Sequence, residues 1–516
     1  MRRLYKIAAA LVFTQGLVLA QDSPSPSSSK KLPFEIDEKK RLGADDVKKK
    51  KEGWYVTGLA GPFSDPNSGS GIGGRVLLFN NKTKDDPFFE YTPYRHRIFF
   101  NPSMTNKNAH YHWLDWDAPF IFDSQWRVRT SLIYDRNPNN LFFGIGESSM
   151  NGLSNRFHNQ RSLPMMDNQS FQDNQNNLNY ARDPRSPNEI RFNSDPFLNS
   201  LIQAQGTAGS NFKITDRMYN RYTLEVPQVQ FSGERSFFKG LVRFVFGARL
   251  SKNTVKTYDG QLYKQVDPLF GEGPDMAQKF MLPSIQGKTK VTEDSEAKKI
   301  VGLNGGYVNM LRIGLVYDTR DFEPDPGKGV FAEVTHERSD AAWGSNYNFN
   351  RTYGSFRSFY TIIPGANKLV FASRVSLVQT NGVAPFFEYR NMWSTEGGLS
   401  GLGGRTTLRG YYQDRFVAPV MGFANFELRW RAYEIPGFTF NIAPLFDIGR
   451  PWDKFSNIDM KDKYLYSYGM GLRIIWNQAT VIYMEWARGR ETKHNDNIAG
   501  APLANTNFYL NFGHIF

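Results

Sequence analysis

EGGLSGLGGRTTLRGY, residues 396–411, is dense in glycine and contains the triplet Leu408-Arg409-Gly410. A glycine run of this density leaves the backbone free to fold back on itself within a confined space. The arginine that follows it carries a charge that it cannot lose. Such a side chain can enter an enclosed space only where carboxylates meet it. We therefore predict that this loop is threaded into a barrel.

The segments on both sides of this loop alternate between apolar and polar residues, which is typical of β-strands. In the strand predicted at 424–432, the apolar residues Ala424, Phe426, Leu428, Trp430 and Ala432 share one face. The opposite face is polar and consists of Asn425, Glu427, Arg429 and Arg431. In a bilayer these faces would meet lipid and lumen, whereas in a soluble sandwich they would meet core and solvent. The aromatic ending FYLNFGHIF favours the membrane.

Composition supports an all-β membrane protein, because the 516 residues include 42 Phe, 25 Tyr and 10 Trp. After the first twenty residues, no stretch is apolar for the roughly 18 residues that a membrane helix requires. High aromatic content with period-2 patterning is the signature of a transmembrane antiparallel β-barrel. We predict about sixteen strands, at 54–63, 70–80, 90–102, 108–120, 124–136, 218–232, 237–252, 306–318, 329–340, 348–363, 368–380, 420–433, 437–448, 465–476, 479–489 and 505–516.

The first fifty residues divide into two segments. Residues 1–20 are predicted to be a secretory signal peptide, with Arg2, Arg3 and Lys6 before an apolar stretch and small-residue cleavage after Ala20. Residues 21–52 are polar and of mixed charge, and they are predicted to form a flexible periplasmic tail. The alternative is a short helix that docks on a partner. Residues 53–516 would form the barrel.

The connector lengths predict the orientation of the barrel. The short turns at 122–124, 232–236, 364–367, 434–437 and 477–480 are expected to be periplasmic. The long connectors near 137–217 and 253–305 are expected to be extracellular loops. The connector near 381–419, which contains the glycine-rich stretch, is expected to lie in the lumen.

The formal net charge of +13 is spread over turns, lumen positions and loops. This distribution favours solvated barrel charge or contact with anionic lipid headgroups, and we expect no nucleic-acid partner. There is no cysteine. The sequence also predicts no metal or cofactor. The acidic run after Asp321 lacks the closing Glu of an EF-hand, and the glycine run lacks the Lys-Ser/Thr of a phosphate-binding loop.

Four motifs in this order resemble the BamA/TamA-type superfamily of outer-membrane barrels, also called the bacterial surface antigen family. The first is YDTRD followed by PDPGKG, which resembles the family motif at a periplasmic turn. The second, GGLSGLGGRTTLRGY, resembles the inward-folded sixth extracellular loop of the family. The third, ANFELRWR, resembles the strand that follows this loop. The fourth, APLFDIGRPWD, resembles the Phe-x-Asp-x-Gly strand, with Leu445 in place of Phe. The resemblance is close over 306–516 and looser over 54–252.

The resemblance implies which residues matter. In the family, the arginine of the loop is thought to latch onto acidic groups of the barrel wall. Here the latch would consist of Arg409, Gly410 and Tyr411, with Glu427 and Asp447 as candidate partners, because alternation places both on the lumen face. The periplasmic-turn motif would comprise Asp318, Arg320, Asp321, Pro326 and Gly329. The C-terminal strand signal would comprise Phe508, Phe512 and Phe516.

The resemblance also implies a function. We expect a non-enzymatic barrel of the bacterial outer membrane that assists insertion or translocation of other proteins. Its expected partners are outer-membrane lipids, together with nascent outer-membrane proteins or periplasmic accessory proteins. The chain has no room for a POTRA domain between Ala20 and Trp54, so it resembles a member that lacks these client-receiving domains. The alternative is a passive structural or transport barrel, or a surface ligand-binding barrel.

Overall fold

The computed structural model describes residues 31–43, 47–48, 50–65, 68–150, 220–259, 288–321, 325–476, 480–490 and 505–512, with five short strands elsewhere. The segment predicted to be a signal peptide, residues 1–20, lies outside the described residues, as does Phe516.

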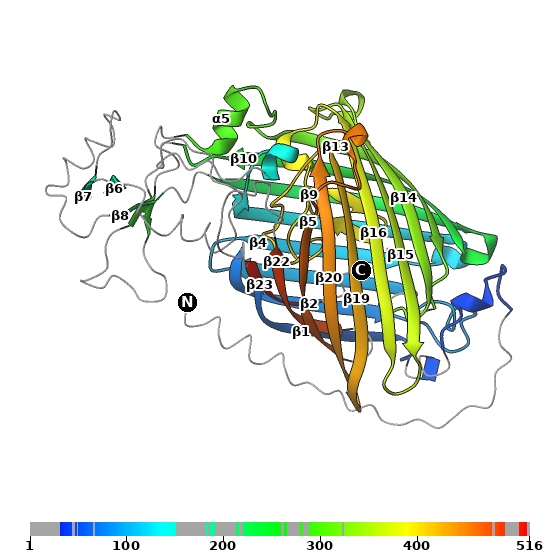
Figure 1. The fold of residues 1–516 in the computed structure, drawn as a ribbon. Coiled ribbons are helices and arrows are strands. Elements are labelled where there is room, and N and C mark those ends of the chain that lie inside the picture. The colour runs from blue at the N-terminus through cyan, green and yellow to red at the C-terminus, as the bar shows by residue number, and fades with distance from the viewer. Residues whose placement is uncertain are drawn as a thin grey trace, which may run out of the picture.

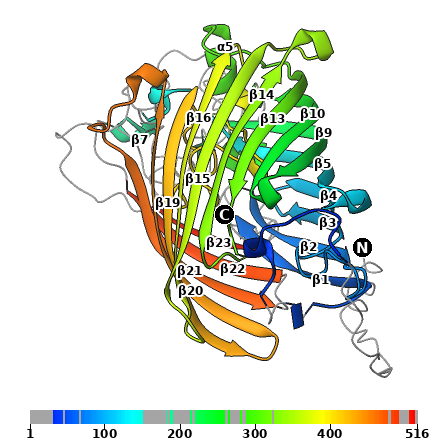
Figure 2. The same ribbon diagram turned by 90° about the vertical axis from the view of Figure 1, so that its right-hand side faces the viewer.

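Sixteen of the described strands form a closed antiparallel barrel, so the predicted fold class is confirmed. The barrel appears in Figure 1 and, turned by a quarter, in Figure 2. Its strands are β1 (Trp54–Asp65), β2 (Gly69–Asn80), β3 (His96–Thr105), β4 (His110–Ala118), β5 (Trp126–Leu141), β9 (Arg221–Phe237), β10 (Val242–Lys256), β13 (Gly306–Asp318), β14 (Gly329–Ser339), β15 (Phe349–Ile363), β16 (Leu369–Gly382), β19 (Val420–Ile435), β20 (Phe438–Trp452), β21 (Leu465–Trp476), β22 (Thr480–Arg490) and β23 (Asn505–Phe512).

The other elements are short. Among the described residues, no helix is long and apolar enough to cross a membrane. The connectors and the N-terminal segment hold η1 (Glu38–Lys40), η2 (Ile121–Asp123), η3 (Glu147–Met150), β6 (Arg182–Asp183), β7 (Ser186–Ile190), β8 (Lys213–Thr215), η5 (Phe238–Gly240), β11 (Tyr263–Gln265), β12 (Lys279–Met281), α5 (Lys290–Glu296), η6 (Ala341–Trp343), η7 (Phe386–Glu388), β17 (Met392–Ser394), β18 (Gly397–Leu399) and η8 (Phe455–Asn457).

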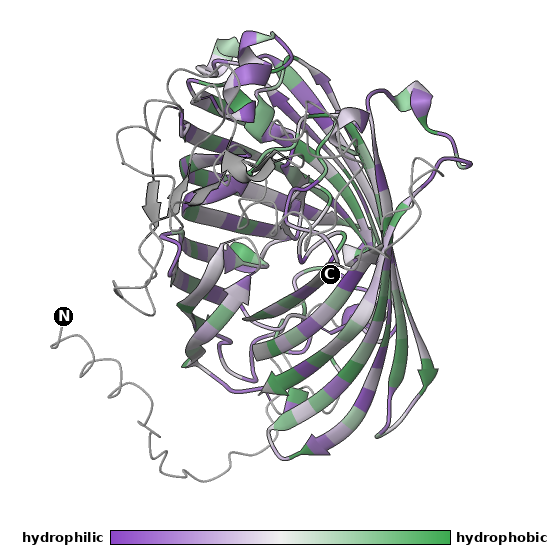
Figure 3. Cartoon of the chain, turned by 60° about the vertical axis from the view of Figure 1, so that its left-hand side comes forward, coloured by the Kyte–Doolittle hydropathy of each residue, from purple (hydrophilic) through white to green (hydrophobic). Residues whose placement is uncertain are grey.

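The two faces of the barrel wall follow from the side-chain alternation of its strands. In β13, the exposed residues Leu311, Ile313 and Leu315 alternate with the buried residues Met310 and Arg312. Figure 3 shows hydrophobic and hydrophilic bands alternating along the strands. Because successive side chains of a strand point to opposite faces, the apolar residues face outward and the polar ones face the lumen. The lumen-facing side chains are buried because a loop fills part of the interior.

Several predicted boundaries differ from the structure by up to about six residues, and two of the differences have a clear cause. The third strand was predicted at 90–102 but begins at His96, because residues 81–95 form a turn held by Arg95. Its guanidinium donates to Asp86 at 3.1 Å and to the carbonyl of Phe120 at 3.0 Å. The turn predicted at 232–236 lies inside β9 instead, and the chain reverses at η5 (Phe238–Gly240).

The barrel is unevenly closed. Strand β1 pairs with β2 along its whole length, from Trp54 opposite Asn80 to Asp65 opposite Gly69. Its pairing with β23, in contrast, is the single pair Ser64–Leu510 among the described residues. Figures 1 and 2 show the first strands, in blue, beside the last strands, in red. The junction of β1 and β23, which we call the seam, is therefore the weakest strand pairing in the described barrel wall.

Candidate functional site

The connector between β16 and β19 lies inside the barrel. We call residues 383–419 the lumen loop. Its tip packs in an apolar cluster with lumen-facing residues of the wall. Leu402, Leu408 and Phe416 have no exposed surface in this cluster, and Tyr411 is almost fully buried. The loop begins in a second apolar cluster, where Phe386 and Phe387 pack with Val291 of α5. Apolar packing at its beginning and at its tip therefore holds the loop in the interior.

Arg409 lies at the tip of the lumen loop and bonds to Asp447 of β20. Its backbone N–H and its Nε both donate to Oδ2 of Asp447, each at 3.0 Å. Its Nη2 donates to Oδ1 of the same carboxylate at 2.6 Å. This geometry is the two-pronged fit of a guanidinium to a carboxylate, with a backbone bond added. A lysine could not reproduce it.

Two further carboxylates meet the same guanidinium. Nη1 of Arg409 lies 2.6 Å from Glu427 of β19 and 3.4 Å from Glu485 of β22. Arg473 of β21 also contacts both glutamates, at 2.8 and 3.4 Å. Arg429 bonds Glu427 at 3.0 Å. Three arginines thus meet three carboxylates, and none of the six side chains is more than 4% exposed.

This cluster, the Arg409 network, is neutral overall when all six groups are ionised. Charges removed from water are costly unless they are paired and their hydrogen bonds are satisfied. Asn425 adds a bond to Asp447 at 2.7 Å and holds the carbonyl of Thr407 at 2.6 Å. Ser467 donates to Asp447 at 3.0 Å. The network therefore holds the loop tip against the wall through many directional bonds.

The loop tip also contacts the last strand of the barrel. The carbonyl of Arg409 accepts from Tyr509 at 3.0 Å and from Asn507 at 3.2 Å. Both residues belong to β23, which forms one side of the seam. The partners of the loop tip consequently extend over β19, β20, β22 and β23.

Gly410 is in close contact with β22. A Cβ atom at this position would lie 2.0 Å from the backbone nitrogen of Gly489 and 2.4 Å from its Cα. Only a residue without a side chain fits, since no real Cβ approaches backbone atoms so closely. The next residue, Tyr411, donates from its hydroxyl to the carbonyl of Tyr466 at 3.1 Å. Two glycines thus allow the loop backbone to lie directly on the wall.

The hairpin β17–β18 of the lumen loop has a separate anchor. Glu333 of β14 accepts from the hydroxyl of Ser394 at 2.5 Å, and from the backbone N–H and hydroxyl of Thr395 at 2.8 Å each. Glu396 pairs with Arg357 of β15 at 2.7 Å and also with Arg320. Arg320 in turn bonds Asp318 at 3.0 Å. The motif that the sequence predicts at a turn is therefore linked to the loop through Arg320.

The remaining turn-motif residues shape the turn. The carboxylate of Asp321 accepts from the backbone N–H of Gly327 at 2.9 Å and of Lys328 at 3.2 Å. Gly329 has φ +105°, a conformation that favours glycine. Pro326 is buried in the same turn. These three residues contact the turn backbone, while Asp318 and Arg320 contact other parts of the chain.

Residues 31–43 of the N-terminal segment lie against the end of the barrel that carries the short turns, and the flexibility expected of residues 21–52 stays a prediction. Phe34 packs on the rings of Phe88 and Phe120, with centroids 5.4 and 5.8 Å apart. Lys40 pairs with Asp318 at 3.2 Å. The docking has a physical cause, because the apolar side chain of Phe34 packs on aromatic rings in the turns of the barrel. The sequence alone does not show where these turns lie.

Lys50 extends this docking. Its Nζ donates to the carbonyls of Phe89 at 2.5 Å and Thr92 at 2.7 Å. Burial lowers the pKa of Lys50 to about 7. The nearby charge of Arg95 acts in the same direction, and Asp86 acts against it.

Phe508 and Phe512 of the predicted C-terminal signal lie on β23. Phe508 packs on Trp486 of β22, with ring centroids 5.0 Å apart. Phe512 is paired in register with Ile482.

The structure brings Arg409, Glu427 and Asp447 together. Sequence reasoning missed Glu485, Arg473, Asn425, Asn507 and Tyr509. Period-2 alternation carries the signal for Glu485, since Tyr483, Glu485 and Ala487 share the buried face of β22. Within the described ranges, no group of three or more His, Cys, Asp or Glu residues could hold a metal ion.

Two protein-family models match the chain. The Omp85 superfamily domain matches residues 114–516, and a domain of unknown function, DUF5982, matches residues 32–95. The second range contains most of the docked N-terminal segment, β1, β2 and the turn that ends at Arg95. No curated protein matches the chain.

Several solved structures resemble this one. BamA from Haemophilus ducreyi lacking POTRA domains 1–3 is 10% identical, with a TM-score of 0.45, over 90% of this chain and 70% of its own. CdiB from Escherichia coli is 11% identical, with a TM-score of 0.46, and the match covers 89% of this chain and 63% of CdiB. CdiB from Acinetobacter baumannii is 10% identical, with a TM-score of 0.41, and the match covers 89% of this chain and 60% of that CdiB.

Proposed function

Because the chain belongs to the Omp85 superfamily, we propose that it is a bacterial outer-membrane barrel that assists the insertion or translocation of other proteins. Membership of this family implies the outer membrane. In the orientation that we propose, the short turns and the docked N-terminal segment are periplasmic. The proposed activity is not enzymatic, since it uses strand pairing and a guided opening of the wall.

The observation that carries this proposal is the seam. Among the described residues, one residue pair joins β1 to β23, which leaves other backbone donors and acceptors of these two strands without a partner in the described wall. Such edges can add an incoming strand, a mode of recognition that uses main-chain hydrogen bonds and is tolerant of sequence. A client strand could pair with an edge of the seam and enter the membrane from there.

The Arg409 network supports the same reading. It joins the lumen loop to β19, β20, β21 and β22, and the loop tip also bonds β23. One side of the seam is therefore fixed to the loop. We propose that this arrangement keeps the last strands in place while β1 moves away from β23.

Another observation favours a second candidate function, a passive barrel for solutes. The lumen contains a cavity of about 1940 Å³ that is lined by the barrel wall and the lumen loop, with many polar and charged side chains among apolar ones. A solute could bind or pass there without any opening of the seam.

Depletion of the protein, followed by a quantitative census of outer-membrane proteins, distinguishes the two functions. Assistance in insertion predicts selective loss of other barrel proteins, restored when the wild-type chain is supplied again. A passive barrel predicts an unchanged protein set, and that result would contradict the proposal.

A further inference from the structure

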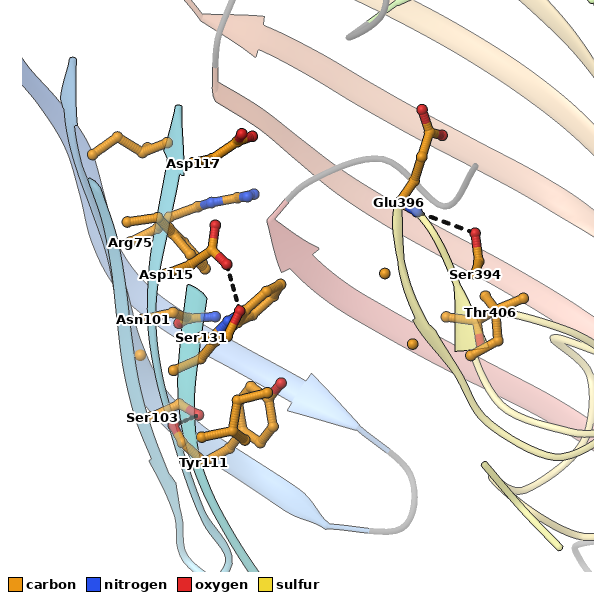
Figure 4. A pocket seen from close by; sticks show the side chains of 18 of the residues that line it. Arg75, Asn101, Ser103, Tyr111, Asp115, Asp117, Ser131, Ser394, Glu396 and Thr406 are labelled. Carbon is orange, nitrogen blue, oxygen red and sulfur yellow. Dashed lines mark hydrogen bonds between the residues drawn. The ribbon is translucent and has the colours of Figure 1, made fainter. Parts of the chain in front are cut away.

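The large lumen cavity separates the wall of β2–β5 from the lumen loop. Figure 4 shows this space, with Arg75 extending from the wall and Ser394, Glu396 and Thr406 on the side of the loop. The cavity volume, about 1940 Å³, exceeds that of typical small-molecule sites, about 300–1,000 Å³. The space between wall and loop is therefore large enough to hold a polar solute.

Most arginines on this wall are paired with carboxylates. Arg97 lies 2.8 Å from Asp115, and Arg127 lies 2.7 Å from Asp117. Asp115 also accepts from Ser131 at 2.6 Å. The carboxylates of the wall are thus engaged by neighbouring side chains.

Arg75 of β2 differs from these arginines. Its side chain has no ion pair and no hydrogen bond to any residue that the structure describes. Its guanidinium lies over the ring of Phe99, 4.6 Å from the centroid. Its Nε is excluded from solvent and has no partner. A guanidinium offers five donors, so this side chain faces the cavity with its donors unused by the described protein.

A second arginine approaches from the loop. Arg405 lines the same cavity, and its Nη1 donates to the hydroxyl of Tyr483 at 3.3 Å. It has no carboxylate within ion-pair distance in the described part of the chain. Arg75, Arg97 and Arg405 all line this cavity, so three positive charges face one space, together with the carboxylate of Asp115. Asp65 and Tyr111 line the same cavity as Arg405.

We propose that Arg75 and Arg405 form a binding site for an oxyanion, the phosphate or carboxylate group of a solute in the lumen. Guanidinium groups match both anions through paired N–H donors. An anion bound by both arginines would offset their mutual repulsion. The hydroxyls of Tyr111 and Tyr483, which line the cavity, supply neutral donors beside the charge. The site goes beyond protein insertion and does not depend on it.

Calorimetric titration of the purified full-length barrel tests the site. Inorganic pyrophosphate and tricarballylate are the two probes, at physiological ionic strength. We expect saturable binding of at least one probe, and its identity tells whether the site takes phosphate or carboxylate. Arg75→Gln and Arg405→Gln should each weaken that binding by about tenfold or more. Arg136→Gln is the matched control, because Arg136 is on the same wall but does not line the cavity.

Heat-dependent migration on a gel verifies that each variant is folded. Arg405 lies in the loop and not in a strand, so its variant keeps the test valid if Arg75→Gln fails to fold. The proposal is overturned if neither probe binds the wild-type barrel saturably, or if the folded Arg405→Gln variant binds as the wild type does. It is also overturned if Arg136→Gln weakens binding equally, since the effect would then reflect net charge alone.

Discussion

Arg409 donates three hydrogen bonds to Asp447, one from its backbone N–H and two from its guanidinium, and the two side chains are fully buried. The backbone bond fixes where the loop tip lies, and the guanidinium bonds fix its direction. Glu427 and Glu485 occupy the remaining edge of the guanidinium. The contact is therefore an ion pair that also fixes the position of the loop tip on the barrel wall.

Arg409→Ala should lower the free energy of unfolding by about 3–5 kcal/mol, because it leaves buried carboxylates without their shared partner. Asp447→Ala should cost less, since Arg409 still meets Glu427. Denaturant titration and heat-dependent gel migration measure both changes. The double variant should be less destabilised than the sum of the single variants, with a coupling energy of about 0.5–3 kcal/mol.

The matched control for this cycle is Arg338→Ala, which removes an arginine from an exposed pair with Asp340 at 2.8 Å. A surface pair of this kind contributes at most about 1 kcal/mol. Strictly additive losses in the Arg409 and Asp447 cycle would show that the two residues do not act as partners.

Gly410→Ala should displace the loop tip from β22, because the new Cβ would overlap the backbone of Gly489. Overpacking of this kind costs about 1–3 kcal/mol, measured as lost heat resistance of the folded barrel. Gly398→Ala in the same loop is the control, as its Cβ would have no neighbour within 4 Å. Equal stability of the two variants would mean that the close contact with Gly489 does not exist.

Docking of the N-terminal segment should strengthen as pH rises from about 7 towards 10.5. The pKa of Lys50 is about 7 when docked, lowered by burial, against an ordinary value of 10.5. Between these values the undocked lysine binds more protons, so raising the pH favours the docked state. Hydrogen exchange at Asp37 and Leu42, corrected for its intrinsic pH dependence, measures docking through their backbone bonds to Lys239 and Glu90.

Lys50→Met is the control for this titration and should flatten the pH dependence between pH 7 and 9. If docking depends on pH with the same slope in the wild type and in the Lys50→Met variant, a group other than Lys50 causes the dependence.

The orientation of the barrel can be tested with single cysteines, because the chain has none of its own. A cysteine at Asn457, exposed in the connector between β20 and β21, should react on intact cells with a membrane-impermeant maleimide. A cysteine at Phe122, which is 92% exposed at a short turn, should react only after the outer membrane is permeabilised. The reverse pattern would invert the topology.

Local patterns predicted the strands and faces well. In β19, alternation placed Glu427 and Arg429 inside and Leu428 and Trp430 outside, as the structure has them. The pairing of Arg409 with Asp447 could be predicted from the sequence. Arg409 lies in a motif that resembles a known loop, and Asp447 lies on a predicted lumen face.

Relationships between distant segments could not be predicted in this way. Alternation predicts which face of the wall a residue lies on. It does not predict the register of its strand, and hence how far along the barrel axis the residue lies. It could therefore not place Glu485 and Arg473 beside Arg409. The docking of Phe34 and Lys40 depends on turns brought together only by closure of the barrel. The single pair at the seam depends on the register of β1 against β23.

The most direct test of the account is to lock the seam. Cysteines at Ser64 and Leu510, the one pair between β1 and β23 among the described residues, can be joined by oxidation in cells that lack the wild-type protein. Cysteines at Ser64 and Ser70 lock β1 to β2 instead and serve as the control. The measurement is the abundance of other outer-membrane barrel proteins. If the seam must open for insertion, the locked seam should reduce this abundance, a reductant should restore it, and the control lock should have no effect. Normal abundance with a fully oxidised seam would show that insertion does not require the seam to open.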